Sequence, residues 1–169
     1  MSEANEIWAG DFILTRNLKE EDNTSPGYWN HCAIYIGDNH IVEAQAGPNA
    51  VIMSDLTEFF NRYPQIIVLR VTDEDSMAAK MVEEGKALVG TPYRKIASIF
   101  NSLRNSRRGE NCVTVVRKCY LTAFTIDPGW RRPDDVKNFG QIIYEKNDLG
   151  GDYKVYKDTP PSPTDQTYG

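Results

Sequence analysis

The three cysteines, at positions 32, 112 and 119, are the candidate nucleophiles of this sequence. Cys112 follows Asn111, a residue that often caps a helix, and precedes apolar residues at helical spacing. We therefore expect Cys112 at or just inside a helix N-terminus, where free N–H groups and the helix dipole stabilise a thiolate and can hold a developing oxyanion. The alternative is a buried, inert thiol, which is what we expect of Cys32 in mid-strand and Cys119 in mid-helix.

His31 is the candidate base, because the sequence has only two histidines and this one opens its strongest β-rich run, His-Cys-Ala-Ile-Tyr-Ile. At a strand edge an imidazole can deprotonate a thiol or stay protonated beside a thiolate. A structural histidine is the alternative. His40 follows Asp38 and Asn39, which is typical of an exposed turn.

Glu43 is the candidate third group. It lies on the strand that follows the turn, where a residue can stand beside one of the preceding strand on the same face. From there its carboxylate can accept a hydrogen bond from His31 and fix the tautomer of the ring. A surface glutamate is the alternative, although Ile41, Val42 and Ala44 make its surroundings apolar.

Strands are predicted in the first half of the chain and helices in the second. The strand patterns cover residues 11–15, 31–36, 40–44, 50–53 and 65–71, with a hairpin across Gly37-Asp38-Asn39. Ser54 is expected to cap a short helix that runs through Phe60. Short strands joined by tight turns indicate an α+β fold in which a small antiparallel, barrel-like sheet packs against helices.

The helical patterns cover residues 75–89, 96–103 and 111–124, with Asp75 or Ser76 capping the first of them. Pro128 and Pro133 then predict an irregular segment. We assign one domain to residues 1–156 and a flexible, proline-rich tail to residues 157–169.

The formal net charge of -5 argues against nucleic acid as a partner, because a phosphate backbone requires a basic face. The one basic cluster, Arg104, Arg107 and Arg108, is interpreted as a solvated loop, with phosphate or substrate binding as the alternative. No apolar run approaches the ~20 residues of a membrane span. The acidic, polar N-terminus lacks a signal-peptide pattern, which predicts a cytoplasmic protein.

Cysteine usage indicates neither a disulfide framework nor a metal centre. The cysteine count is odd and no Cys-x-x-Cys pair occurs. A zinc site would have to gather scattered side chains, so we expect no metal and no cofactor. The oligomeric state is not indicated by any pattern.

An ordered set of short motifs resembles the permuted papain-like cysteine hydrolases that include the YiiX/YebB-type NlpC/P60 enzymes, and more distantly the lecithin:retinol acyltransferase-like enzymes. The set spans roughly residues 8–136 and consists of Gly10-Asp11-Phe12-Ile13, His31-Cys32-Ala33-Ile34-Tyr35-Ile36-Gly37, Val42-Glu43-Ala44, Gly90-Thr91-Pro92-Tyr93, Asn111-Cys112 and Pro133-Asp134-Asp135-Val136. The resemblance implies a permuted papain-like fold.

The resemblance also implies site residues: Cys112 as nucleophile, His31 as base, Glu43 as orienting acid, and Tyr93 as a helper near the oxyanion or a wall of the cleft. Val113, Thr114 and Arg94 stand where the family pattern has Ser, Glu and Asp. These departures bear on substrate preference rather than on the triad.

The expected function is that of a cysteine peptidase or amidase that cleaves an amide bond in a short peptide, with cell-wall peptide as the first candidate substrate. One alternative is a lipid acyl hydrolase or acyltransferase of the same fold. The other is an inactive module that binds a peptide or a partner protein.

Overall fold

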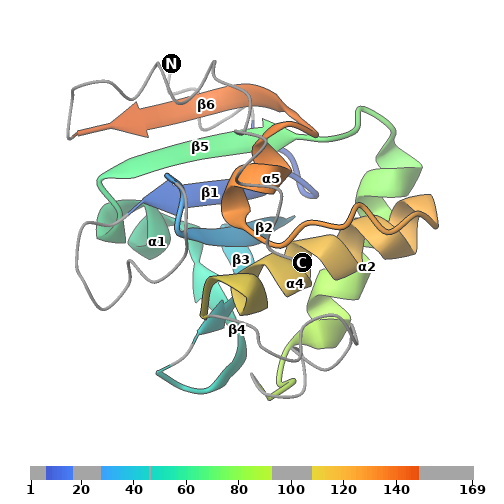
Figure 1. The fold of residues 1–169 in the computed structure, drawn as a ribbon, viewed down its shortest axis with the longest axis horizontal. Helices are drawn as coiled ribbons and strands as arrows, with labels where there is room; N and C mark the ends of the chain where they lie inside the picture. The colour runs from blue at the N-terminus through green and yellow to red at the C-terminus, as the bar shows by residue number, and fades with distance from the viewer. Residues whose placement is uncertain (1–6, 17–27, 46, 93–107, 149–169) are drawn as a thin grey trace.

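The computed structural model describes residues 7–16, 28–45, 47–92 and 108–148, and leaves the side chains of residues 108–111 undescribed. Its centre is one open, antiparallel sheet of six strands in the order β4-β3-β2-β1-β5-β6 (Figure 1). The strands are β1 Phe12–Arg16, β2 His31–Gly37, β3 His40–Gln45, β4 Ala50–Asp55, β5 Gln65–Arg70 and β6 Gln141–Asn147.

The predicted hairpin joins β2 to β3. Gly37, Asp38 and Asn39 all have positive φ, at 92°, 51° and 62°. Glycine, aspartate and asparagine tolerate this left-handed conformation best, which is why the chain reverses here. The hairpin places His31 at the start of β2 and Glu43 near the end of β3, at the same end of the sheet.

Helices cover the two faces of the sheet unequally. The helices are α1 Leu56–Arg62, α2 Asp75–Leu88, α4 Arg108–Phe124 and α5 Pro133–Lys137. Helices α2 and α4 pack against each other and contact β2 (Figure 1). Because side chains alternate along a strand, Cys32, Ile34 and Ile36 of β2 enter this larger core, whereas Ala33 enters the smaller core around Phe59 of α1.

The α+β fold with an antiparallel sheet and packed helices is confirmed, but the predicted cap residues of three helices are wrong. Asp55, not Ser54, caps α1, and its side chain accepts a hydrogen bond from the N–H of Glu58 at 2.9 Å. Helix α2 begins at Asp75 after Glu74, which makes no side-chain cap bond. Helix α4 begins at Arg108, so Asn111 lies inside the helix and does not cap it.

The segment after α4 is more regular than the sequence indicated. Pro133 occupies the first turn of α5, where a missing N–H costs nothing. Strand β6 was not predicted, because it is a half-exposed edge strand with little apolar alternation and pairs only with β5. The predicted helix 96–103 and the tail 157–169 lie outside the described residues, and the domain boundary at residue 156 stays a prediction.

Candidate active site

Cys112, His31 and Glu43 come together where β2 begins. Nε2 of His31 lies 2.9 Å from Oε1 of Glu43. The side chain of Cys112 interacts with the His31 ring, because it is among the groups that raise the pKa of His31. The structure therefore brings the three residues together, with His31 hydrogen-bonded to Glu43 and interacting with Cys112.

The register of the hairpin explains the contact between His31 and Glu43. Tyr35 pairs with Ile41 across the two strands, and His31 and Glu43 each lie an even number of residues from that pair. Side chains at even spacing share a face of the sheet, so both point to the side that α1 covers.

Glu43 is a buried carboxylate that stays ionised. Its side chain is fully buried, yet Oε1 also accepts a hydrogen bond from Nε2 of Gln45 at 2.9 Å, and Oε2 pairs with Nη2 of Arg62 at 3.3 Å. Burial raises the pKa of Glu43, but hydrogen bonds from His31, Gln45 and Ser54 and the charge of His31 lower it to about 2. The carboxylate is thus available as an acceptor throughout the neutral pH range.

The His31 ring is held by packing as well as by hydrogen bonds. It stacks on Tyr63, with ring centroids 5.8 Å apart and an interplanar angle of 23°, and it contacts Phe59 at 6.0 Å. Burial by itself lowers the pKa of His31, but Tyr63, Cys112 and Glu43 act in the opposite direction and raise it well above its usual value. Because Nε2 faces Glu43, Nδ1 is the ring nitrogen left for Cys112.

The thiol of Cys112 is activated by neighbouring side chains. Cys112 is the fifth residue of α4, so its own N–H can enter the intrahelical pattern and is not among the four free N–H groups of the helix start. A hydrogen bond from Cys32 lowers the pKa of Cys112, burial opposes this, and His31 lowers it further, to about 5. Cys112 thus lies one turn inside α4, and the groups that lower its pKa come from β2.

Sequence reasoning missed four neighbours of the site. Gln45 lies two residues beyond Glu43 on the same face, so strand alternation could have indicated it. Arg62 and Tyr63 come from the end of α1, and no local pattern links them to His31. Cys32 is a fully buried core residue, as expected, but it also contacts Cys112.

The remaining residues that the sequence singled out lie away from these three side chains or outside the described residues. Cys119 is fully buried, and burial raises the pKa of its thiol, which fits the inert thiol that was expected. His40 is exposed at the turn. Tyr93, Arg94, Arg104 and Arg107 lie outside the described residues, and the side chain of Arg108 is not described.

Two carboxylates that follow α4 in the sequence bind segments next to the site. Asp134 binds the segment before β2, and Asp127 binds Arg117 of α4. Asp134 of α5 accepts hydrogen bonds from the N–H groups of Tyr28 and Trp29, at 2.8 and 2.7 Å, and so holds the segment that leads into His31. Burial raises the pKa of Asp134, although these two hydrogen bonds lower it. The motif residue Asp134 therefore has a positional role next to the site.

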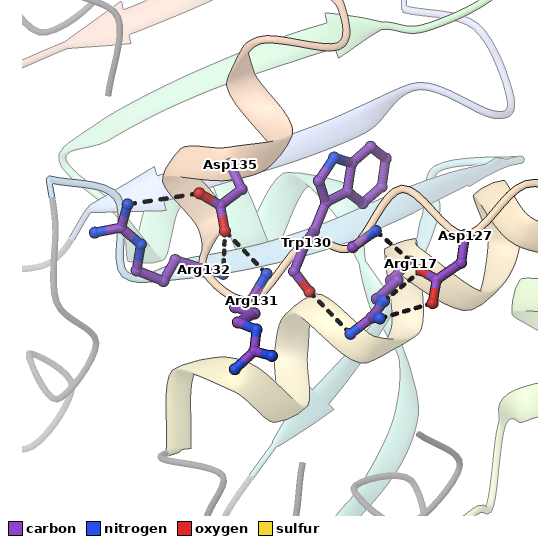
Figure 2. Close-up of polar contacts among 7 residues, drawn as sticks. Arg117, Asp127, Trp130, Arg131, Arg132 and Asp135 are labelled. Carbon is purple, nitrogen blue, oxygen red and sulfur yellow. Dashed lines mark hydrogen bonds and ion pairs between the residues drawn. The ribbon is translucent and has the colours of Figure 1, made fainter. Parts of the chain in front are cut away.

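Arg117 fixes α4 to the segment that follows it. Figure 2 shows its guanidinium between Asp127, at 2.7 Å from both Nε and Nη2, and the carbonyl of Trp130, at 3.2 Å. In the same view the N–H groups of Arg131 and Arg132 donate to Asp135 of α5 at 2.9 and 3.0 Å. The Arg117 contacts tie α4 to the segment that follows it, and the Asp135 contacts hold the start of α5.

Within the described ranges, no group of three or more His, Cys, Asp or Glu side chains is arranged to hold a metal ion. In the same ranges, no helix is long and apolar enough to cross a membrane.

Comparison with known proteins identifies the family and the fold. Residues 6–163 match the model of a family described as permuted papain-like amidase enzyme, YaeF/YiiX, C92 family. The fold is similar to the crystal structure of the metalloprotein YiiX from Escherichia coli O157:H7, with a TM-score of 0.55, 20% sequence identity, and coverage of 73% of this chain and 71% of that chain. No significant match is found among curated proteins.

Proposed function

The chain belongs to the permuted papain-like amidase family, and we propose that it hydrolyses an amide bond in a short peptide with Cys112 as nucleophile, His31 as acid–base group and Glu43 as orienting acid. The observation that carries this proposal is the gathering of these three side chains at the start of β2, where His31 is hydrogen-bonded to Glu43 and interacts with Cys112. A thiol, an imidazole and a carboxylate in this order are the groups that covalent amide hydrolysis requires.

The resting site is a thiolate–imidazolium pair. The pKa of Cys112 is lowered to about 5 while that of His31 is raised, so at neutral pH the proton lies on the imidazole. This form needs no proton transfer before attack. Glu43 accepts from Nε2 and stabilises the imidazolium.

Acylation then proceeds with the proton already in place. The sulfur of Cys112 attacks the carbonyl carbon, a C–S bond forms, and the carbonyl electron pair moves to oxygen. His31 gives its Nδ1 proton to the leaving nitrogen, and the C–N bond breaks as the carbonyl reforms. The products of this half-reaction are a thioester on Cys112, a free amine and a neutral imidazole.

Deacylation restores the resting pair. Neutral His31 takes a proton from water, and the hydroxide attacks the thioester carbon. The C–S bond then breaks, the carboxylic acid leaves, and the sulfur departs as a thiolate beside the new imidazolium. Glu43 keeps Nε2 protonated through both half-reactions, so Nδ1 is always the nitrogen that exchanges protons.

A substrate panel tests this proposal. Purified protein is incubated with short peptides, with cell-wall stem peptides and with phospholipids, and released amines and fatty acids are quantified. We expect amine release that Cys112→Ala reduces by a factor of about 10⁴ or more, with its circular dichroism unchanged. Cys119→Ala is the matched control, because it removes a second buried thiol from the same helix and is expected to keep activity.

The other outcomes are informative. Fatty-acid release without amine release would replace the peptide substrate with a lipid acyl bond. Turnover by Cys112→Ala at the native rate would contradict the nucleophile assignment. Binding of a peptide without turnover, by a Cys112 of ordinary reactivity, would favour the binding-module alternative.

A further inference from the structure

Arg62 is a charged neighbour of Glu43 to which the mechanism above gives no role. Its Nη2 lies 3.3 Å from Oε2 of Glu43. The other oxygen of the same carboxylate, Oε1, lies 2.9 Å from Nε2 of His31 and accepts a hydrogen bond from Gln45 at 2.9 Å. The two oxygens therefore face different partners, because Oε1 meets the imidazole and Oε2 meets the guanidinium.

A partner on each oxygen fixes the plane of the carboxylate. The last torsion of a glutamate side chain is broad, so a carboxylate with partners on one oxygen only can still turn about that bond. The contact between Arg62 and Oε2 limits this rotation. With Oε2 held toward α1, Oε1 stays directed at Nε2 of His31.

Two aromatic side chains hold Arg62 and His31 beside each other. Arg62 lies in the last turn of α1, and its guanidinium carbon is 5.4 Å from the ring centroids of both Phe59 and Tyr63. The same two rings contact the His31 ring, with centroids 6.0 and 5.8 Å away. The end of α1 thus carries both the rings that pack on the imidazole and the cation that binds its carboxylate partner.

Arg62 also balances the charge of the site. In the resting pair, the thiolate of Cys112 and the carboxylate of Glu43 are two negative charges, and the imidazolium of His31 is one positive charge. Arg62 supplies the second positive charge, while the other described groups that bind Glu43, Gln45 and Ser54, are neutral. The Arg62 side chain is 39% exposed and that of Glu43 is fully buried, so the guanidinium offsets the buried charge while it keeps part of its own hydration.

We propose that Arg62 is a positioning residue that holds Oε1 of Glu43 toward His31, and so keeps Nε2 of the imidazole hydrogen-bonded and Nδ1 available to Cys112. The role rests on the proposed function, because Arg62 acts through the pair of Glu43 and His31. A cation in the last turn of a helix also interacts favourably with the helix dipole. That second role concerns α1 alone and does not reach the imidazole.

The test is nuclear magnetic resonance of the protein labelled with ¹⁵N-histidine, recorded at pH 7. The sequence has only two histidines, so His40→Ala assigns the signals of His31. In the native protein we expect a downfield, slowly exchanging Nε2–H proton on His31, which is typical of a charge-assisted hydrogen bond. Arg62→Gln should move this signal upfield and raise its exchange rate with water about tenfold, since the carboxylate is no longer held.

Two variants separate positioning from a general effect on stability. Arg62→Lys keeps a cation in place of the single Nη2···Oε2 contact and is expected to recover most of the native signal. Lys86→Gln is the matched control, because it removes the basic residue from the last turn of α2 and should leave the His31 signal unchanged. A helix-dipole role alone would lower the thermal stability of Arg62→Gln and leave its Nε2–H signal as in the native protein.

The results also separate this inference from the proposed function. A slowly exchanging Nε2–H proton that Arg62→Gln leaves unchanged would overturn the role of Arg62 and leave the triad standing. A native Nε2–H proton that exchanges as freely as that of the exposed His40 would overturn the contact between His31 and Glu43, and the proposed function with it.

Discussion

Helix α4 carries two buried cysteines whose thiols have opposite pKa shifts. Cys112 and Cys119 are seven residues apart and belong to the same apolar cluster. The pKa of Cys112 is lowered to about 5 by Cys32 and His31, whereas burial and the charge of Glu84 raise that of Cys119. Burial alone raises the pKa of a thiol, as at Cys119. The groups at the start of β2 outweigh burial at Cys112 and lower its pKa.

The neighbours of the two sulfurs explain the difference. Cys112 interacts with His31 and Cys32 at the start of β2. Cys119 faces α2, where a Cβ at Gly85 would lie only 3.6 Å from its sulfur, so the two helices are in close contact there. In the C-terminal half of α4, the buried side chain of Arg117 binds Asp127 and the carbonyl of Trp130, and so ties the helix to the segment that follows it.

We expect the N-terminal half of α4, which carries Cys112, to serve the chemistry and the C-terminal half, which carries Cys119, to serve the fold. The largest effect that separates the two halves is expected from His31→Ala. This change removes the proton carrier and the positive charge beside Cys112. We expect amide hydrolysis at pH 7 to fall by a factor of about 10³ to 10⁴, with the fold retained. His40→Ala is the matched control and should be neutral, because that residue is exposed at the turn. Equal losses in both variants would contradict the assignment of the base.

Glu43→Gln is expected to act through His31 and to cost less. The amide keeps the volume but not the charge, so the imidazolium loses its partner and hydrolysis should fall by about 10²-fold. The acid stability should change as well. The pKa of Glu43 is depressed to about 2 in the folded state, so its stabilising contribution is complete above the unfolded value of ~4.3 and is lost as the pH falls toward 2.

Urea unfolding between pH 6 and pH 2 checks the second part. The native protein should lose stability over that window more steeply than Glu43→Gln does. Parallel curves would mean that the carboxylate does not carry the depressed pKa.

Asp127→Asn is expected to lower the stability of the fold and to leave the reactivity of Cys112 unchanged. It leaves the buried guanidinium of Arg117 without its anion, which should lower the free energy of unfolding by about 1–3 kcal/mol at pH 7. The Arg117 contact lowers the pKa of Asp127, so the contribution is present at neutral pH and is lost as the pH falls through that lowered value. Denaturant unfolding measures the loss, and an unchanged Cys112 alkylation midpoint is the companion result. A shifted midpoint of Cys112 alkylation would show that the contacts in the C-terminal half of α4 also affect the thiol in its N-terminal half.

Cys119→Ala should give the smallest effect. A small cavity forms in the larger core, so we expect a loss of stability of about 1 kcal/mol and native activity. Thermal unfolding and the peptide assay check this. A strong loss of activity in a stable Cys119→Ala protein would show that the C-terminal half of α4 also takes part in the chemistry.

The contact between His31 and Glu43 could be predicted because it depends on local rules. Gly37, Asp38 and Asn39 fix the turn, and alternation then puts residues 31 and 43 on one face. The strands β1 to β5 were predictable for the same reason, since their apolar runs are short and bounded by turn residues.

The surroundings of the site could not be predicted, because they depend on non-local packing. Arg62 reaches Glu43 from the end of α1, and Asp134 reaches Trp29 from α5, and neither contact leaves a pattern in the sequence. Asn111 was predicted to cap α4, but a residue that often caps helices does not prevent the helix from beginning earlier, here at Arg108. Cys112 is therefore the fifth residue of α4 rather than the residue after its cap.

The central claim, that Cys112 and His31 form a thiolate–imidazolium pair, is tested most directly by the pH dependence of Cys112 alkylation in the native protein and in His31→Ala. We predict a native midpoint of about 5 and an upward shift of about two pH units or more when the imidazole is removed. A Cys112 that titrates near ~8.5 in both proteins would contradict it.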